Sequence, residues 1–249
     1  MKSRHCPGNG FTRLELLFVI VLLLVLIGMV VPPPRPHAMK VYKVVCMNNL
    51  RILSDATQFY LYDWSHDAKN TNAVISPLLS WTDYRKAIGT HVPGVKGAPS
   101  PEDSHLACPK DTFYYPINSK VSTRISQPLH EQSNFVYTSY AYNAGYTIVP
   151  GTNNSPPTTN FHGIAGMKLD SIAHPSRTVL LAEFPALAPY SWHDSKRPLL
   201  SNSSRFNNAQ DMLAFVDGHV TYTKMYYDSK KLAWEYNPPA GYNYQWSGD

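Results

Sequence analysis

The side chains able to do chemistry in this 249-residue chain include ten histidines and three cysteines. They do not occur in the spacings of common metal or nucleophile sites, because H-x3-H, HExxH and CxxC are all absent. A G-x-S-x-G nucleophile elbow and a phosphate-binding glycine loop are absent too. We therefore expect no enzyme and no cofactor.

Oxygen-bearing side chains near the C-terminus are the remaining candidate for a metal. Asp211 and Asp217, with Asn207 nearby, could offer oxygen ligands to Ca²⁺. A structural interpretation competes with calcium, because Asp217-Gly218 is a favoured turn sequence and Asp211 could pair with Lys224.

A β-hairpin over "MLAFVDGHVTYTKMYY" must position these side chains. Asp217 and Gly218 predict a two-residue type I′ turn between β-branched and aromatic residues. The facing pairs are then Val216 with His219, Phe215 with Val220, Leu213 with Tyr222, and Asp211 with Lys224. Further strands are predicted in "TSYAYNAGYTIV" and "RTVLLAEF", separated by loop-like segments rich in Pro, Gly, Ser and Asn.

Two helical segments precede the strands. The apolar stretch from Phe11 to Val31 would span about 30 Å as a helix, the thickness of a hydrocarbon core. Prolines break the helix over residues 32–37. An amphipathic helix is predicted beyond them, because apolar residues recur at helical spacing: Val41, Val45, Leu50, Leu53, Ala56, Tyr60 and Trp64.

Three interpretations of the apolar stretch compete: a cleaved secretory signal, an ordinary signal anchor and the first helix of a pilin-like protein. No A-x-A site follows the stretch, which argues against the first interpretation. Arg13 and Glu15 stand just inside its edge, where a charge costs about 2–3 kcal/mol at worst. These two residues either flank the membrane and snorkel, or have a function there.

The segment "GFTRLELL" from Gly10 resembles the prepilin peptidase site of type IV pilins and type II secretion pseudopilins. In that family a short basic leader, here residues 1–10, is cut after Gly10 and the new terminal Phe11 is N-methylated. The family resemblance implies that Glu15 pairs with the Phe11 amine of a neighbouring subunit. The segments "LACPKD", "SYAYNAGY", "HPSRTVLLAEF" and "RFNNAQDMLAFVDGHV" resemble pseudopilin-like proteins with an H-x9-DG motif, although Asn207 stands where the motif has histidine.

This resemblance implies an α+β fold with a membrane helix over residues 11–31 and an exported head over 38–249 whose helix packs on an antiparallel sheet. The Pro-rich break over residues 32–37 departs from the family, in which the first helix commonly continues into the head. Lys2 and Arg4 in the leader predict a cytoplasmic N-terminus, so we expect a single-pass inner-membrane protein with its head in the periplasm or at the cell surface. Its partners would be prepilin peptidase, other pilin-like subunits and the inner membrane. The alternative is a membrane-tethered exported binding protein or hydrolase that uses the leader only for delivery. The net charge is +5, but the basic residues are scattered, so nucleic-acid binding is not expected.

Removal of the leader would take Cys6 with it and leave Cys46 and Cys108. In an oxidising compartment this even pair predicts a disulfide. Two buried free thiols are the alternative. The aromatic residues of the tail "WEYNPPAGYNYQW" either pack on the head or bind sugars or a partner.

Overall fold

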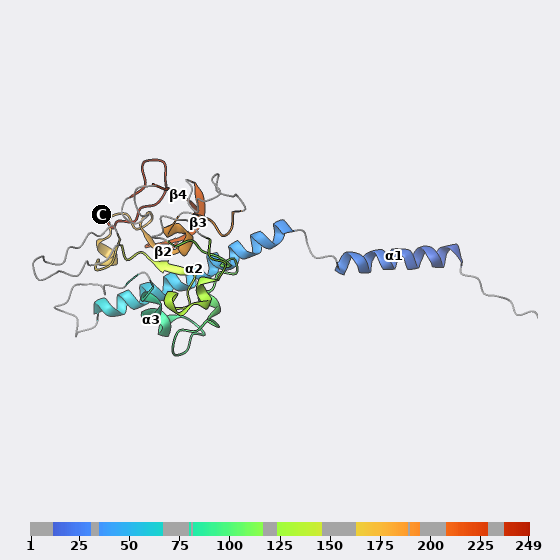
Figure 1. Ribbon diagram of the computed structural model, residues 1–249, viewed down its shortest axis with the longest axis horizontal. Coiled ribbons are helices and arrows are strands. Elements are labelled where there is room, and N and C mark those ends of the chain that lie inside the picture. The colour runs from blue at the N-terminus through green and yellow to red at the C-terminus, as the bar shows by residue number, and fades with distance from the viewer. Residues whose placement is uncertain are drawn as a thin grey trace, which may run out of the picture. The chain divides into compact units, whose positions relative to one another are not determined.

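The computed structural model describes residues 12–30, 35–66, 80, 82–116, 124–145, 163–188, 190–194, 208–228 and 237–249. The chain divides into two compact units, one up to Lys40 and one from Val41 onward. Figure 1 shows the helices and strands of both units. Each unit is described by itself below.

The first unit contains helix α1, Arg13–Val30, which is 18 residues long. Its described apolar side chains, from Leu14 to Ile27, are between 44% and 80% exposed. Among the described residues, no helix combines the length and the apolar character needed to cross a membrane. At 1.5 Å per residue α1 is about 27 Å long, and its first turn holds two charged residues, Arg13 and Glu15. The structure therefore contradicts the predicted membrane helix over residues 11–31, and with it the single-pass inner-membrane localisation.

Helix α2, Arg35–His66, begins in the first unit and continues into the second. The helix thus begins inside the predicted Pro-rich break over residues 32–37, because Pro36 lies in its first turn, where a missing N–H donor costs nothing. The buried face of α2 is formed by Cys46, Asn49, Leu50, Leu53, Ser54, Ala56, Thr57 and Leu61. Val41 and Val45, expected on this face, are 57% and 37% exposed, so the buried stripe starts one turn later than the sequence pattern indicates.

The second unit is built on one antiparallel sheet in the order β1-β2-β3-β4. Its strands are β1 Tyr140–Tyr142, β2 Val179–Glu183, β3 Ala209–Phe215 and β4 Val220–Met225. All five residues of β2 are buried, which places this strand in the middle of the core. Short helical segments fill the connections: α3 Tyr84–Ile88, η2 Gly89–His91, η3 Ser104–Leu106, η4 Leu129–Glu131, η5 Ser133–Phe135, η6 Leu169–Ser171 and η7 Phe184–Leu187.

The β3–β4 hairpin forms where the sequence predicts it, but with a different register. Phe215 N donates to His219 O at 2.9 Å, and Gly218 N donates to Phe215 O at 2.9 Å, so the loop has three residues. Gly218 adopts a φ of 89°, which permits a turn closed by a left-handed glycine. Every facing pair therefore shifts by one residue, and Asp211 lies opposite Thr223 instead of Lys224.

Three residues of α2 contact other segments of the second unit. Lys43 Nζ lies 3.7 Å from the centre of the Tyr222 ring in β4. Gln58 Nε2 donates to Val216 O at 3.3 Å in the hairpin turn. Cys46 forms a disulfide with Cys108, with 5.4 Å between their Cα atoms. The predicted disulfide is therefore confirmed, and the alternative of two free thiols is not.

The C-terminal tail packs on the head. Tyr244 and Trp246 are buried, and Asn143 Nδ2 donates to Trp246 O at 2.7 Å. Gln245 N also donates to Arg177 O at 2.8 Å. These two aromatic rings therefore belong to the core and are not available to a sugar or a partner.

Replacing Cys46 with Ser should lower the stability of the oxidised protein. The bridge closes a sequence separation of 62 residues, so its loss should cost about 4 kcal/mol on the chain-entropy model. Thermal unfolding of wild type and Cys46→Ser, both with a chelator present, measures the difference. Cys6→Ser is the matched control, and equal melting temperatures for wild type and Cys46→Ser would contradict a stabilising bridge.

Candidate functional site

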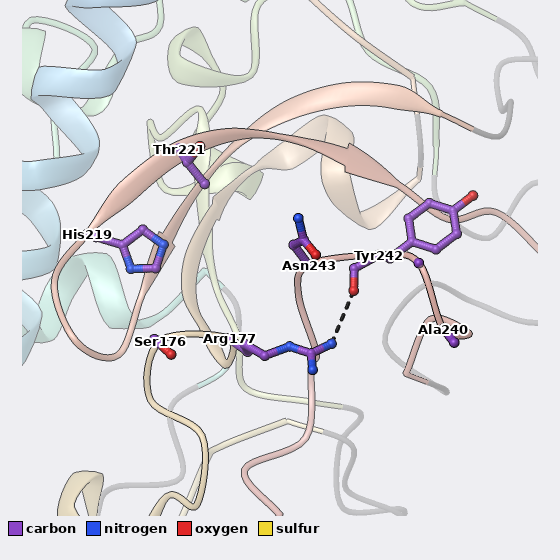
Figure 2. A pocket seen from close by; sticks show the side chains of 8 residues that line it. Ser176, Arg177, His219, Thr221, Ala240, Tyr242 and Asn243 are labelled. Atoms are coloured by element: carbon purple, nitrogen blue, oxygen red, sulfur yellow. Dashed lines mark hydrogen bonds between the residues drawn. The ribbon is translucent and has the colours of Figure 1, made fainter.

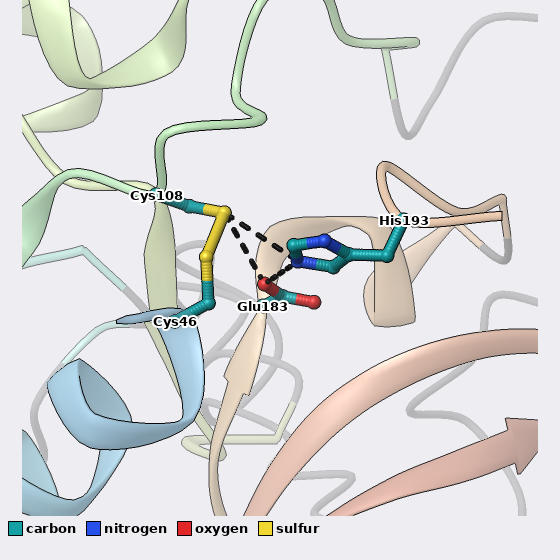
Figure 3. A group of neighbouring side chains, drawn as sticks. All are labelled: Cys46, Cys108, Glu183 and His193. Carbon is teal, nitrogen blue, oxygen red and sulfur yellow. Dashed lines mark hydrogen bonds and ion pairs between the residues drawn. A yellow bond between two sulfur atoms is a disulfide. The ribbon is translucent and has the colours of Figure 1, made fainter. Parts of the chain in front are cut away.

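Four chemically active side chains from four separate segments meet in the core of the second unit (Figure 3). Cys46 comes from α2, Cys108 follows the short helix η3, Glu183 is the last residue of β2, and His193 follows η7. All four are buried, and one ligand atom of each lies within 4.8 Å of the others. We refer to these residues as the Cys-Glu-His cluster.

The distances in the cluster are those of direct polar contacts. Glu183 Oε1 lies 2.9 Å from His193 Nε2, in a carboxylate–imidazole pair. Cys108 Sγ lies 3.4 Å from the same carboxylate oxygen and 3.6 Å from His193 Nε2. Cys108 Sγ, one of the two disulfide sulfurs, therefore contacts both the buried Glu183 carboxylate and the buried His193 imidazole.

Backbone and hydroxyl groups hold the cluster in place. Met212 N, in β3, donates to Glu183 Oε2 at 3.1 Å, so both carboxylate oxygens are occupied. Cys108 N donates to Ser139 Oγ at 2.9 Å, and that hydroxyl donates to Asp111 Oδ2 at 2.7 Å. Within the described part of the chain, the buried Nδ1 of His193 has no hydrogen-bond partner.

The oxidation state of the sulfurs determines what this arrangement can do. With the disulfide formed, neither sulfur is a thiolate, so neither can attack a substrate or bind a metal. With the thiols free, two sulfurs, one imidazole and one carboxylate are four ligands of the types that bind zinc in proteins. The cluster is thus structural when oxidised and a potential metal site when reduced.

A second buried acid, Asp211, lies near the cluster. Neither of its carboxylate oxygens has a hydrogen-bond partner among the described residues. Burial raises the pKa of Asp211 well above its ordinary value, and the negative charges of Glu183 and Asp194 add to the effect. The raised pKa favours the neutral acid inside the fold.

The residues considered for calcium are not brought together. Asp211 is buried in β3, whereas Asp217 lies in the exposed turn beyond the end of that strand. At about 3.3 Å per residue, the strand keeps the two carboxylates well apart. Asp217 Oδ1 instead lies 2.6 Å from His219 Nδ1. Asn207 lies outside the described residues.

The structure gives Glu15 a local role. Glu15 Oε2 accepts hydrogen bonds from the backbone N and the hydroxyl of Thr12, both at 2.9 Å, and Glu15 N donates to Thr12 Oγ1 at 3.3 Å. This reciprocal pattern is a capping box at the start of α1. The backbone bond first, and then the hydroxyl, lower the pKa of Glu15, so its carboxylate is charged at neutral pH. Gly10 and Phe11 lie outside the described residues.

A surface pocket of about 600 Å³ lies beside the hairpin turn (Figure 2). Arg177 Nη2 donates to Tyr242 O at 3.1 Å, and His219 is another residue that lines the pocket. The guanidinium is thus already engaged by the protein, and the other lining residues are small or neutral: Ser176, Thr221, Ala240, Gly241 and Asn243. This pocket shares no residue with the Cys-Glu-His cluster.

Sequence reasoning did not single out Glu183 or His193. The two residues stand ten positions apart and match no ligand motif, and the turn η7 between them brings their side chains together. One signal was available, because Glu183 ends an otherwise apolar strand, "VLLAE". A carboxylate in such a strand must find a buried partner.

Comparison with models of protein families, with curated proteins and with solved structures found no match to this chain.

Asp211→Asn should stabilise the protein at neutral pH and have little effect near pH 4. The pKa of Asp211 is higher in the folded chain than in the unfolded chain, where it is about 4. Wild-type stability is therefore highest below pH 4, and it falls as the pH rises from there toward the pKa of the folded chain. Asparagine does not ionise, so the expected gain at pH 7 is about 1–3 kcal/mol. Denaturant unfolding at both pH values measures it, with exposed Asp170→Asn as the control. A gain that is the same at pH 4 and pH 7 would contradict a buried ionisable acid.

Proposed function

We propose that this chain is a pilin-like structural subunit whose α1 helices pack against one another in a filament of the type IV pilus or type II secretion kind. The observation that carries the proposal is α1 itself. Every described apolar side chain on this helix is at least 44% exposed, on all sides. Exposed apolar surface of this extent is unfavourable in water and indicates a partner surface.

Equivalent helices from other subunits are the partner that fits α1 best. Its apolar residues cover the whole circumference between Leu14 and Ile27, so a single groove on one partner would leave most of them uncovered. A bundle of like helices would surround each α1 with apolar side chains. The sequence from Gly10 to Glu15, which resembles a prepilin peptidase site, lies directly before this surface.

Because Glu15 caps its own helix, an experiment must distinguish this local role from its proposed role in the filament. Glu15 already satisfies the first turn of its own helix through Thr12. In the proposed filament the same carboxylate also meets the N-terminal amine of Phe11 on the next subunit. Glutamine at position 15 can make the capping bonds but carries no charge. Alanine there has no group that can make the capping bonds and also carries no charge.

Glu15→Gln should therefore impair assembly even though the cap is retained. A cysteine placed by Val21→Cys, in the apolar part of α1, reports helix–helix contact through disulfide-linked dimers in cells of the native host. We expect dimers in the Val21→Cys background and about tenfold fewer after Glu15→Gln or Glu15→Ala, because both remove the charge pair.

Two results would contradict this proposal. Normal dimer formation with Glu15→Gln and loss only with Glu15→Ala would assign Glu15 to capping alone. Absence of Val21→Cys dimers at normal protein levels would argue against a filament subunit and in favour of the delivered binding protein or hydrolase.

The proposal also predicts the mature N-terminus. Cleavage after Gly10 should yield a chain that begins with N-methylated Phe11, and mass spectrometry of the protein from its native host detects both changes. Gly10→Val should leave the leader attached, because the peptidase site needs a small residue there. An intact Met1 terminus on the wild-type protein, or cleavage at another position, would contradict processing by prepilin peptidase.

A further inference from the structure

We propose that, when its two thiols are free, this chain binds one zinc ion through Cys46, Cys108, Glu183 and His193, and that disulfide formation expels the ion. Both states use the same two sulfur atoms, so they exclude each other. This inference is independent of the filament proposal, because the cluster lies in the second unit and α1 in the first.

The geometry already contains part of a tetrahedral zinc site. Bond lengths of about 2.3 Å to sulfur and 2.0–2.1 Å to nitrogen or oxygen separate a sulfur ligand from a nitrogen or oxygen ligand by about 3.5 Å. Cys108 Sγ lies 3.4 Å from Glu183 Oε1 and 3.6 Å from His193 Nε2, so two edges of the tetrahedron are in place.

The remaining adjustments are small. The 2.9 Å separation of Glu183 Oε1 and His193 Nε2 must lengthen to about 3.3 Å when an ion replaces the shared hydrogen. Cys46 Sγ must move from its bond with Cys108 to about 3.8 Å from that sulfur. The Cα atoms of the two cysteines are 5.4 Å apart, so side-chain rotation is the principal movement required.

The electrostatics of the cluster favour a cation. Glu183 is fully buried, and within the described part of the chain its one ion-pair partner is His193, a residue that need not be charged. A divalent ion would compensate the negative charge of the Glu183 carboxylate.

The chemistry balances in both directions. On binding, each cysteine thiol releases its proton to water and forms a zinc–sulfur bond. The neutral imidazole binds through the Nε2 lone pair with its one N–H hydrogen on Nδ1, and the carboxylate binds through Oε1. On oxidation by a small disulfide such as oxidised glutathione, the two thiolates give up one electron each and form the Cys46–Cys108 bond. The added disulfide takes up the two electrons and two protons from water to become two thiols, and the ion leaves.

Cobalt(II) is the probe, because its spectrum distinguishes tetrahedral thiolate ligation. The full-length chain is purified without oxygen and with free thiols, and a second portion is oxidised with oxidised glutathione. The reduced protein should bind one equivalent of cobalt, with thiolate charge-transfer and tetrahedral ligand-field bands, and zinc should displace it. The oxidised protein should show neither band.

Variants test whether all four residues participate. Glu183→Gln and His193→Gln should each weaken cobalt binding at least tenfold, since each removes one ligand. His219→Gln is the matched control, because this exposed histidine lies outside the cluster and pairs with Asp217. Binding that is unchanged in both cluster variants would overturn the site, since the thiols alone would then hold the ion.

A measurement on the wild-type protein keeps the test independent of whether the variants fold. X-ray absorption at the zinc edge of the reduced, zinc-loaded chain should resolve two sulfur neighbours at about 2.3 Å and two nitrogen or oxygen neighbours at about 2.0–2.1 Å. Four sulfur neighbours, no sulfur neighbours, or equal zinc content in the oxidised protein would each overturn the proposal.

Discussion

The junction of Cys46 with Cys108 is the contact on which the organisation of the head depends. It joins α2 to the segment after η3, and Cys108 in turn contacts Glu183 at the end of the central strand β2. Glu183 then reaches β3 through the backbone N–H of Met212. These buried contacts thus connect the helix, a long loop and two strands. Burial of the Glu183 carboxylate costs free energy, and the contacts with these partners offset that cost.

The hairpin shows how a single backbone conformation alters buried chemistry. The left-handed conformation of Gly218 makes the loop one residue longer than the predicted two-residue turn. Side chains alternate along a strand, so a shift of one position changes every cross-strand pair. Asp211 consequently loses Lys224 as its facing residue and is buried without an ion-pair partner among the described residues.

Helix α1 differs from the head in how far its apolar side chains are buried. The head buries most of its described apolar residues in one core, whereas the described apolar residues of α1 are exposed. Local interactions are enough to form the helix, because the Thr12–Glu15 capping box closes its first turn. They do not cover its apolar surface, and the proposed filament of like helices is one arrangement that would cover it.

Local patterns allowed the sequence by itself to determine several features: the helical segment after the prolines, the strand-like segments, a turn at Asp217-Gly218 and the pair of cysteines available for a bridge. Each of these depends on neighbours within a few positions, or on composition. The length of the apolar helix was overestimated, because the pattern of apolar residues does not show where the helix begins and ends. Only the tertiary structure decided the hairpin register and the meeting of Glu183 and His193 with the disulfide. These features depend on which segments pack together in three dimensions, and no spacing in the sequence encodes that packing.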